Sequence, residues 1–245
     1  MRYYVVSDVH GYYTPLIEAL TDKGFFEDKE PRKLIVCGDL FDRGREAKEL
    51  QTFILDLMEK DEVILIRGNH EDLFMQLLDL DEGFPCYPHD VNGTYNTGLQ
   101  LIESDDTASI IYPKRYVASA RRTPYVSRII PSMLNYFETE HYIFVHGWIP
   151  CVNQGGGKYY GGWRNASAEM WDESRWLNGM QMWGAGVREE GKTIVCGHCR
   201  ASYGHSKFEG KNGDPDDSPF IADGIMAIDA CTKFSYKVNC VIIED

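Results

Sequence analysis

Short apolar, β-branched runs alternate with amphipathic segments in the first third of this chain. Strand patterns cover residues 2–6, 33–37 and 62–66, and helical spacing of apolar residues covers 46–60 and 70–80. Such an alternation implies right-handed crossovers between parallel strands. In sheets of this kind, ligands bind beyond the carboxyl ends of the strands. The pattern therefore predicts an α/β fold and also the sheet edge at which a functional site should lie.

Metal-binding side chains directly follow these strand patterns and two later ones. Strands that end in Asp, Asn and His place hard oxygen and imidazole ligands at one edge of a sheet, where they can hold two divalent ions side by side. These ligand types suit Mn, Fe, Zn or Co better than a soft copper site. The motifs are Asp8-Val9-His10-Gly11, Gly38-Asp39-Leu40-Phe41-Asp42-Arg43-Gly44, Gly68-Asn69-His70-Glu71, His146-Gly147 and Gly197-His198.

Each motif alone has a simpler explanation. An Asp after a strand is often a helix N-cap, and a Gly can serve only the geometry of a turn. A single His is more often a hydrogen-bonded polar residue than a ligand. The joint pattern is different, because all the motifs occur together and in one order. Chance assembly of that set is very improbable, so the pattern predicts a dinuclear metal site.

On these motifs the chain resembles the phosphoprotein phosphatase family, within the wider calcineurin-like metallophosphoesterases, in its bacterial, phage-type or diadenosine tetraphosphatase-like branch. The first three motifs match the family pattern residue for residue, and the resemblance runs from Asp8 to His198 and into the last strands. It implies two mixed β-sheets packed face to face with flanking helices. It also implies hydrolysis of a phosphate ester by in-line attack of a hydroxide that bridges two metal ions.

The resemblance further implies a ligand set for two divalent metal ions. Mn is the expected metal, and Fe, Zn, Co and Ni are the alternatives. The implied ligands are Asp8 and His10 for one ion, Asp39 as the bridging carboxylate, and Asn69, His146 and His198 for the other ion.

Residues beside these ligands are expected to act on the ester. By resemblance His70 protonates the leaving alkoxide or lies beside the scissile oxygen, and Asp42 is positioned to hold the His70 ring. Arg43 should grip phosphate oxygens together with Asn69, because a planar guanidinium matches a phosphate face. The simpler alternatives are that Asp42 pairs with Arg43 or a backbone amide, and that Arg43 forms a structural ion pair. The intact motif favours the catalytic roles.

A second phosphate-binding Arg is harder to assign. The family has one before the last histidine, and the candidates here are Arg164, Arg175 and Arg188. We choose Arg175, because a Trp-rich helical segment that carries an Arg is similar to the family's arrangement. A helix that only packs on its Trp residues would explain this Arg equally well.

The last motif departs from the family pattern, which usually has Gly-His-Thr. Cys199 follows His198 instead, and the run from Cys196 to Cys199 resembles a thioredoxin-type redox motif when it is taken alone. That run ends a strand late in the chain, and a redox function explains none of the other motifs. A redox protein that uses Cys196 and Cys199 is therefore the alternative from another class. A zinc site through both is weaker, because no second cysteine pair has suitable spacing.

The chain is expected to form a single domain, residues 1–245, with a loop and helical insertion at about 81–138. The segment 81–113 is rich in Gly, Pro, Asn and Asp and predicts a loop that leads into helices. Two final strands, at 224–228 and 234–243, are expected to be antiparallel neighbours in the second sheet.

An excess of acidic residues limits the partners. Asp and Glu number 38 against 25 Lys and Arg, and the net charge is -13. Because duplex binding usually needs a basic face, a nucleic-acid duplex is not an expected partner. No apolar run approaches the roughly 20 residues that span a bilayer, and the first one is too short for a signal peptide. We expect a cytoplasmic location and no membrane partner, and we leave the oligomeric state open.

The substrate is the least determined property. We expect phosphoserine or phosphothreonine of a phosphorylated protein, or a small phosphate monoester. Aromatic residues crowd the variable segments, and most of them are expected to pack in the interior. Some could instead wall a groove and stack on a nucleobase. The alternative is therefore a symmetrical bis(5'-nucleosyl)-tetraphosphatase, a diadenosine tetraphosphate hydrolase, because those enzymes share these motifs.

Overall fold

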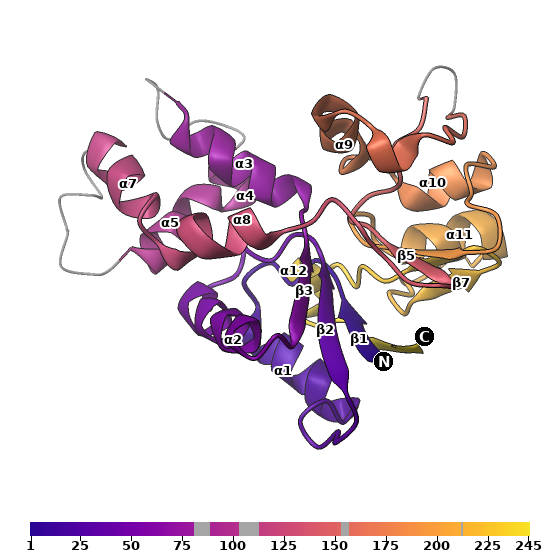
Figure 1. Ribbon diagram of the computed structural model, residues 1–245, viewed down its shortest axis with the longest axis horizontal. Helices are drawn as coiled ribbons and strands as arrows, with labels where there is room; N and C mark the ends of the chain where they lie inside the picture. Colours follow the sequence, from indigo (N-terminus) through magenta and orange to yellow (C-terminus); the bar gives the residue numbers. More distant parts are fainter. Residues whose placement is uncertain (81–88, 103–112, 153–156, 212) are drawn as a thin grey trace.

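Two β-sheets form the centre of the molecule, and helices surround them (Figure 1). Part of the loop expected at 81–113 lies outside the residues that the structure describes. The computed structural model describes residues 1–80, 89–102, 113–152, 157–211 and 213–245.

The first sheet contains the alternating strands of the N-terminal third. β1, β2 and β3 pair in parallel, with Val5 opposite Ile35 and Ile35 opposite Ile64. Each crossover passes through a helix, as the sequence pattern predicts. The elements are β1 (Arg2–Val6), α1 (Tyr13–Asp22), β2 (Arg32–Cys37), α2 (Ala47–Glu59), β3 (Val63–Ile66) and α3 (Asn69–Leu78).

The second sheet is mixed and comes from the second half of the chain. Its order is β4-β5-β6-β8-β7. The three central strands β5, β6 and β8 are parallel, and the edge strands β4 and β7 are antiparallel to their neighbours. Its strands are β4 (Phe137–Glu138), β5 (Tyr142–Phe144), β6 (Thr193–Cys196), β7 (Phe220–Ala222) and β8 (Ile225–Ala227).

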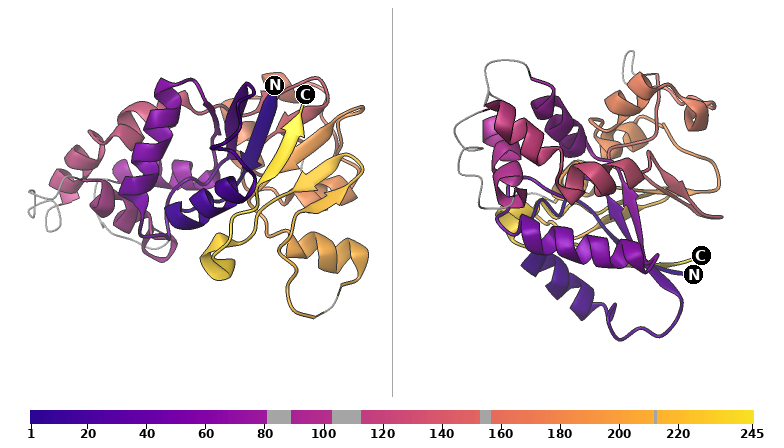
Figure 2. Two further views of the ribbon diagram at one scale, coloured as in Figure 1. Left: turned by 90° about the horizontal axis from the view of Figure 1, so that it is seen from below. Right: turned by 60° about the vertical axis from the view of Figure 1, so that its left-hand side comes forward.

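The predicted position of the last strand was wrong. β9 (Val241–Glu244) pairs antiparallel with β1 in the first sheet, with Ile243 opposite Tyr3, and does not join β8. The strand is also shorter than 234–243, because Thr232–Ser235 form the short helix α12. A period of two specifies the buried face of a strand but not the edge that it joins, which depends on the path of the chain. The two chain ends therefore lie side by side (Figures 1 and 2).

The two sheets pack face to face. Tyr3 and Val5 of β1 form one apolar cluster with Phe144 of β5, Val195 of β6 and Ile243 of β9. Alternate residues of the same strands point to the outer faces, where helices cover them. Figure 2 shows helices outside both sheets. The predicted fold class is confirmed: an α/β structure with two mixed sheets packed face to face and flanking helices.

The segment after α3 is more helical than its composition predicts. α4 (His89–Asn92) and α5 (Thr94–Leu101) lie where a loop was expected. Gly93, between them, has a φ of 79°, which lets one helix turn directly into the next. A Cβ on Gly98 would clash with the ring of Tyr116, so this glycine allows close helix packing. The glycines that suggested a loop therefore join and pack helices.

The other helices extend the outer layers. α5 packs against α2, α3 and α7, so the segment enlarges the helical layer over the first sheet. The remaining helices of the outer layers are α7 (Pro113–Ala120), the π-helical turn Tyr125–Ile129, α8 (Ile130–Ser132), the 3₁₀ turn Trp163–Asn165, α9 (Ala168–Ser174), α10 (Gly179–Gly184) and α11 (Ser202–Glu209).

Within the described residues, no helix combines the length and apolarity that crossing a membrane would require.

Adjacent isoleucines of β9 provide a matched test of its position. Ile243 is 3% exposed between the sheets, whereas Ile242 is 43% exposed on the other face. Ile243→Ala should lower the free energy of unfolding by about 2–5 kcal/mol, because it leaves a cavity in the core. Ile242→Ala should lower it by less than about 1 kcal/mol. Urea denaturation measures both, and equal losses would contradict this placement.

Candidate metal centre

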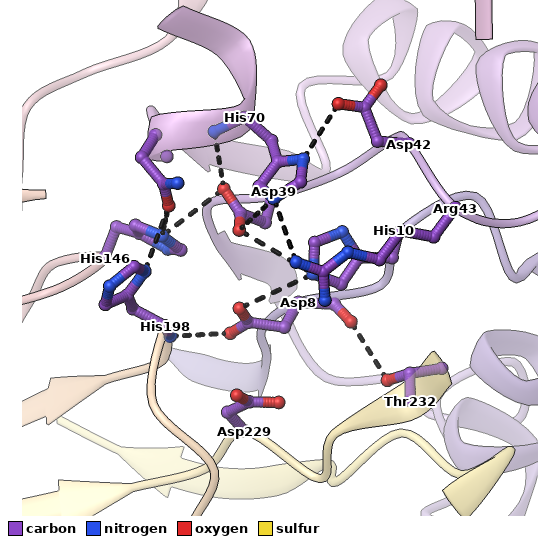
Figure 3. Close-up of polar contacts among 12 residues, drawn as sticks. Asp8, His10, Asp39, Asp42, Arg43, His70, His146, His198, Asp229 and Thr232 are labelled. Atoms are coloured by element: carbon purple, nitrogen blue, oxygen red, sulfur yellow. Dashed lines mark hydrogen bonds and ion pairs between the residues drawn. The ribbon is translucent and has the colours of Figure 1, made fainter. Parts of the chain in front are cut away.

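The strand-terminal motifs come together at the carboxyl ends of both sheets (Figure 3). Asp8 follows β1, Asp39 follows β2, and Asn69 follows β3 in the first sheet. His146 and His198 follow β5 and β6 in the second sheet. The face-to-face packing of the sheets thus brings together side chains that lie far apart in the sequence.

The loops that carry these side chains have unusual backbone conformations. The φ values of Asp8, His10 and Asp39 are 51°, 52° and 53°, and that of His198 is 63°. Non-glycine residues rarely adopt this left-handed region, and such strain commonly occurs at functional sites. Gly197 lies so close to Asp8 that a Cβ would clash with the Asp8 carboxylate. The packing of the loops therefore holds the strained residues in place.

One group of candidate ligand atoms lies around Oδ2 of Asp39. His10 Nε2 lies 3.7 Å from Asp39 Oδ2 and 4.0 Å from Asp8 Oδ1. His10 Nδ1 lies 3.0 Å from the carbonyl oxygen of Phe41 and must donate to it, because a carbonyl can only accept. The lone pair of Nε2 therefore faces the two carboxylates.

A second group surrounds the other oxygen of Asp39. His146 Nε2 is 3.3 Å from Asp39 Oδ1 and 2.8 Å from Asn69 Oδ1. His198 Nδ1 is 3.0 Å from the same amide oxygen. His146 Nδ1 donates to the carbonyl oxygen of Cys37 at 2.8 Å, which leaves its Nε2 lone pair facing oxygen acceptors.

Both groups fit divalent metal ions. Lone pairs that converge on oxygen acceptors repel each other unless a cation lies between them, and a backbone carbonyl that holds the far ring nitrogen is typical of a metal-binding His. Burial lowers the pKa of His10 and His146, and it lowers the pKa of His198 to about 4. The imidazoles are therefore neutral at pH 7, the form that binds metal. The structure brings together His10, Asp39 and His70 in one compact group and Asp39, His146 and His198 in another, so Asp39 belongs to both, as a bridging ligand would.

His70 lies within the first group, with its Nε2 3.9 Å from Asp39 Oδ2, and it is held by Asp42. Its Nδ1 donates to Asp42 Oδ2 at 2.8 Å, and its Nε2 is 3.1 Å from Arg43 Nη2. Burial opposes protonation of His70, but Asp39 and Asp42 together raise its pKa above the usual value. Because a guanidinium can only donate, Arg43 donates to Nε2, so this nitrogen is engaged by Arg43 in the structure; an acid–base role for His70 stays a prediction.

A cavity of about 130 Å³ opens onto these groups. Seven residues that the sequence motifs single out line it, together with Leu73, Asn92, Trp176, Asp229 and Cys231. The seven are Asp8, His10, Asp39, Arg43, Asn69, His70 and His198.

Residues 1–214 match the model of a family described as calcineurin-like phosphoesterase. The chain belongs to the calcineurin-like phosphoesterase family. Among curated relatives, an asymmetrical bis(5'-nucleosyl)-tetraphosphatase PrpE of Bacillus velezensis is 39% identical over 77 residues, which are 29% of this chain and 30% of that protein. Serine/threonine-protein phosphatase 2 of Salmonella typhimurium is 35% identical over 92 residues, which are 38% of each chain. The aligned part thus spans about a third of these relatives.

Solved structures agree on the fold of this phosphoesterase. A cold-active protein tyrosine phosphatase superposes with a TM-score of 0.58 at 17% identity, covering 99% of this chain and 73% of that one. A structure titled a putative diadenosine tetraphosphatase superposes with a TM-score of 0.53 at 13% identity, covering 99% of this chain and 89% of that one. At these identities the likeness concerns the fold alone.

Arg175 does not line the cavity of this phosphoesterase. Its guanidinium contacts Asp172 at 2.6 Å, Asn135 at 3.1 Å and Asp72 at 3.3 Å. Arg164 pairs with Glu138 and Glu189, and Arg188 lies over the Trp183 ring. A phosphate-binding role for Arg175 stays a prediction, and it would require the side chain to exchange these partners.

Two acidic residues support the site without having been assigned a role from the sequence. Buried Glu71 accepts hydrogen bonds from the backbone N–H groups of Gly68, Asp39 and Leu40, so it joins two of the motif loops. Its place three residues after Gly68 is a capping signal that could have been recognised. Asp229 lines the cavity and follows β8, so it has the same strand-terminal position as the predicted ligands.

The cysteines beside His198 lack the features of a redox centre. Cys196 is buried, and burial raises its pKa well above the usual value. Burial also raises the pKa of Cys199 to about 12. Reactive cysteines need a lowered pKa and exposure, so these thiols behave as packing groups.

Removal of the shared carboxylate tests the metal centre. Asp39→Asn takes the charge from both groups, so the chain purified from manganese-supplemented medium should lose most of its bound metal. His70→Asn, which leaves the six ligands implied by the resemblance in place, should keep the wild-type content of about two ions per chain. Elemental analysis by mass spectrometry measures both, and an Asp39→Asn chain with full metal content would contradict the bridging role.

Proposed function

We propose that this protein is a divalent-metal-dependent phosphoesterase that hydrolyses phosphate monoesters, with phosphoserine and phosphothreonine of proteins as the preferred class. The observation that carries the proposal is the His70–Asp42 pair beside the metal-ligand groups. An alkoxide is a poor leaving group and needs a proton as it departs, whereas a phosphate chain departs without one. An acid placed beside the cavity therefore suits an alkyl monoester.

The chain's own residues have separable tasks in this reaction. His70 Nε2 accepts from Arg43 in the structure, so it carries the proton for the leaving oxygen once Arg43 turns to the phosphate, while Asp42 fixes the ring through Nδ1. Arg43 and Asn69 line the cavity and contact phosphate oxygens, which stabilises charge on those oxygens as water attacks in line. Bound metal ions, with Mn as the proposed metal, supply positive charge for the phosphate and lower the pKa of water.

A second candidate function is hydrolysis of dinucleoside polyphosphates. The observation that favours it is Trp176, which is 51% exposed at the cavity and lies edge-on to His198 with ring centroids 6.0 Å apart. An exposed indole beside a phosphate site suits stacking on a nucleobase. Several relatives carry names of bis(5'-nucleosyl)-tetraphosphatases, which supports the same candidate.

A substrate panel separates the two candidates. The manganese-loaded chain is assayed with phosphoserine and phosphothreonine peptides and with diadenosine tetraphosphate. We expect the higher kcat/KM on the peptides, and His70→Asn should lower kcat on them by about 100-fold. Higher kcat/KM on diadenosine tetraphosphate would replace the first candidate with the second. Metal-loaded wild-type chain that hydrolyses neither would refute both.

Trp176→Ala tests the second candidate alone. If a nucleobase stacks on this indole, kcat/KM for diadenosine tetraphosphate should fall by about tenfold or more, since stacking contributes about 1–3 kcal/mol per base. Activity on phosphopeptides should change much less. Phe26→Ala is a matched control, because it removes another exposed aromatic ring, 44% exposed, that does not line the cavity. Equal losses on both substrates would argue against base stacking.

A further inference from the structure

One face of helix α5 contacts the loop that carries Asp42. Thr94, Thr97 and Gln100 are spaced three residues apart and therefore lie on the same side of the helix. Each of them hydrogen-bonds to the segment from Asp42 to Ala47. Helix α5, which lies where the composition predicted a loop, therefore directly contacts Asp42 of the His70–Asp42 pair.

Thr94 shares an acceptor atom with His70. Its hydroxyl donates to Asp42 Oδ2 at 2.9 Å, and His70 Nδ1 donates to the same oxygen at 2.8 Å. The other oxygen, Oδ1, is buried and has no hydrogen-bond partner among the described residues. The rotation of this carboxylate therefore depends on two donors, one of which is the group that it is meant to hold. Of the two donors, Thr94 is the one that takes no part in the proposed proton transfer.

The same helix also holds the backbone of this loop. The amide N–H of Asp42 donates to Thr97 Oγ1 at 3.1 Å. Asp42 and Arg43 have φ values of 72° and 66°, two consecutive non-glycine residues in the left-handed region. Gly93, the residue before α5, lies against Arg43. A Cβ added to Gly93 would lie 2.8 Å from the backbone nitrogen of Arg43.

The far end of this helix face completes the contact. Gln100 Oε1 accepts from the amide of Ala47 at 3.1 Å, and its Nε2 donates to the carbonyl oxygen of Gly44 at 3.0 Å. The contacts of α5 thus hold the loop at three points: the Asp42 side chain, the strained backbone of Asp42 and Arg43, and the start of α2. Neighbours of this kind can hold a strained conformation in place.

We propose that α5 positions the general acid and that Thr94 is a positioning residue, which fixes the Asp42 carboxylate and through it the His70 ring. The inference rests on the proposed function, because it takes His70 as the proton donor to the leaving oxygen. Thr94 is not among the residues that line the cavity, so it would act on the ester only through Asp42. Its contribution therefore depends on how much the leaving group needs a proton.

This dependence separates positioning from a purely structural role. An alkyl leaving group needs the proton from His70, whereas p-nitrophenolate leaves readily without it. Loss of the Thr94 hydroxyl should therefore harm hydrolysis of alkyl phosphates selectively. A role in folding or metal binding would lower the activity on both substrates by the same factor.

The experiment compares Thr94→Val, Thr94→Ser and Thr52→Val in the full, manganese-loaded chain. Valine keeps the shape of threonine without the donor, and serine restores the donor. Thr52 is an exposed threonine of α2 whose hydroxyl donates to the Lys48 carbonyl, so Thr52→Val removes a similar bond away from the site. The readouts are kcat and KM on a phosphoserine peptide and on p-nitrophenyl phosphate, together with metal content.

For Thr94→Val we expect kcat on the phosphoserine peptide to fall by about tenfold, a part of the usual contribution of a general acid, with little change in KM. On p-nitrophenyl phosphate kcat should stay within about twofold, and Thr94→Ser should return the peptide rate toward wild type. Thr52→Val should match wild type on both substrates.

Two results would overturn the role of Thr94. One is an equal loss on both substrates by Thr94→Val, and the other is no loss on either. Both leave the phosphoesterase function in place, because the wild-type chain is active in each case. A metal-loaded wild-type chain that is inactive on both substrates would instead refute the proposed function, and the role of Thr94 with it.

Discussion

The buried carboxylate of Asp39 is the group on which the arrangement of the site depends. Its Oδ1 accepts a hydrogen bond from the backbone N–H of His70 at 3.0 Å and lies 3.3 Å from His146 Nε2. Its Oδ2 lies 3.7 Å from His10 Nε2. A buried carboxylate is costly unless cations or donors balance it. The imidazoles of His10 and His146 are neutral near pH 7 because burial lowers their pKa values. The charge balance therefore calls for bound cations at this position.

Neighbouring acidic groups increase the same requirement. Burial, Asp229 and Asp39 raise the pKa of Asp8 well above its usual value. Burial likewise raises the pKa of Asp229 to about 6. The protein has a net charge of -13, and Arg43 is a basic residue that lines the same cavity. The electrostatics of the cavity thus agree with the ligand geometry, since both are satisfied by divalent ions.

Rigid support is the second theme of the structure. Glu71 joins the loops of Gly68 and Asp39 by accepting hydrogen bonds from three backbone N–H groups. Helix α5 holds the loop of Asp42 through hydrogen bonds of Thr94 and Thr97. Both supports act on residues with strained backbones or buried charges, where small displacements would alter proton transfer. The reacting groups therefore lie on loops, but those loops are fixed by packed helices.

Much of the fold followed from local patterns. Strand and helix periods in the first third were confirmed because each element buries its own apolar face. Two predictions failed for one reason. β9 joins the first sheet, and α4 and α5 replace an expected loop, because the partner of a strand and the packing of a glycine-bearing helix depend on distant residues. Neither feature can be predicted from a short stretch of neighbouring residues.

By itself, the sequence determined which side chains meet at the strand ends, from Asp8 to His198. The physical reason is that a polar residue directly after a buried strand must emerge at the edge of the sheet. Only the tertiary structure decided what surrounds them: Thr94 on Asp42, Asp229 and Trp176 in the cavity, and the contacts that keep Arg175 outside it. These neighbours come from elements brought together by packing across long stretches of chain, and side-chain type alone carries no record of that packing.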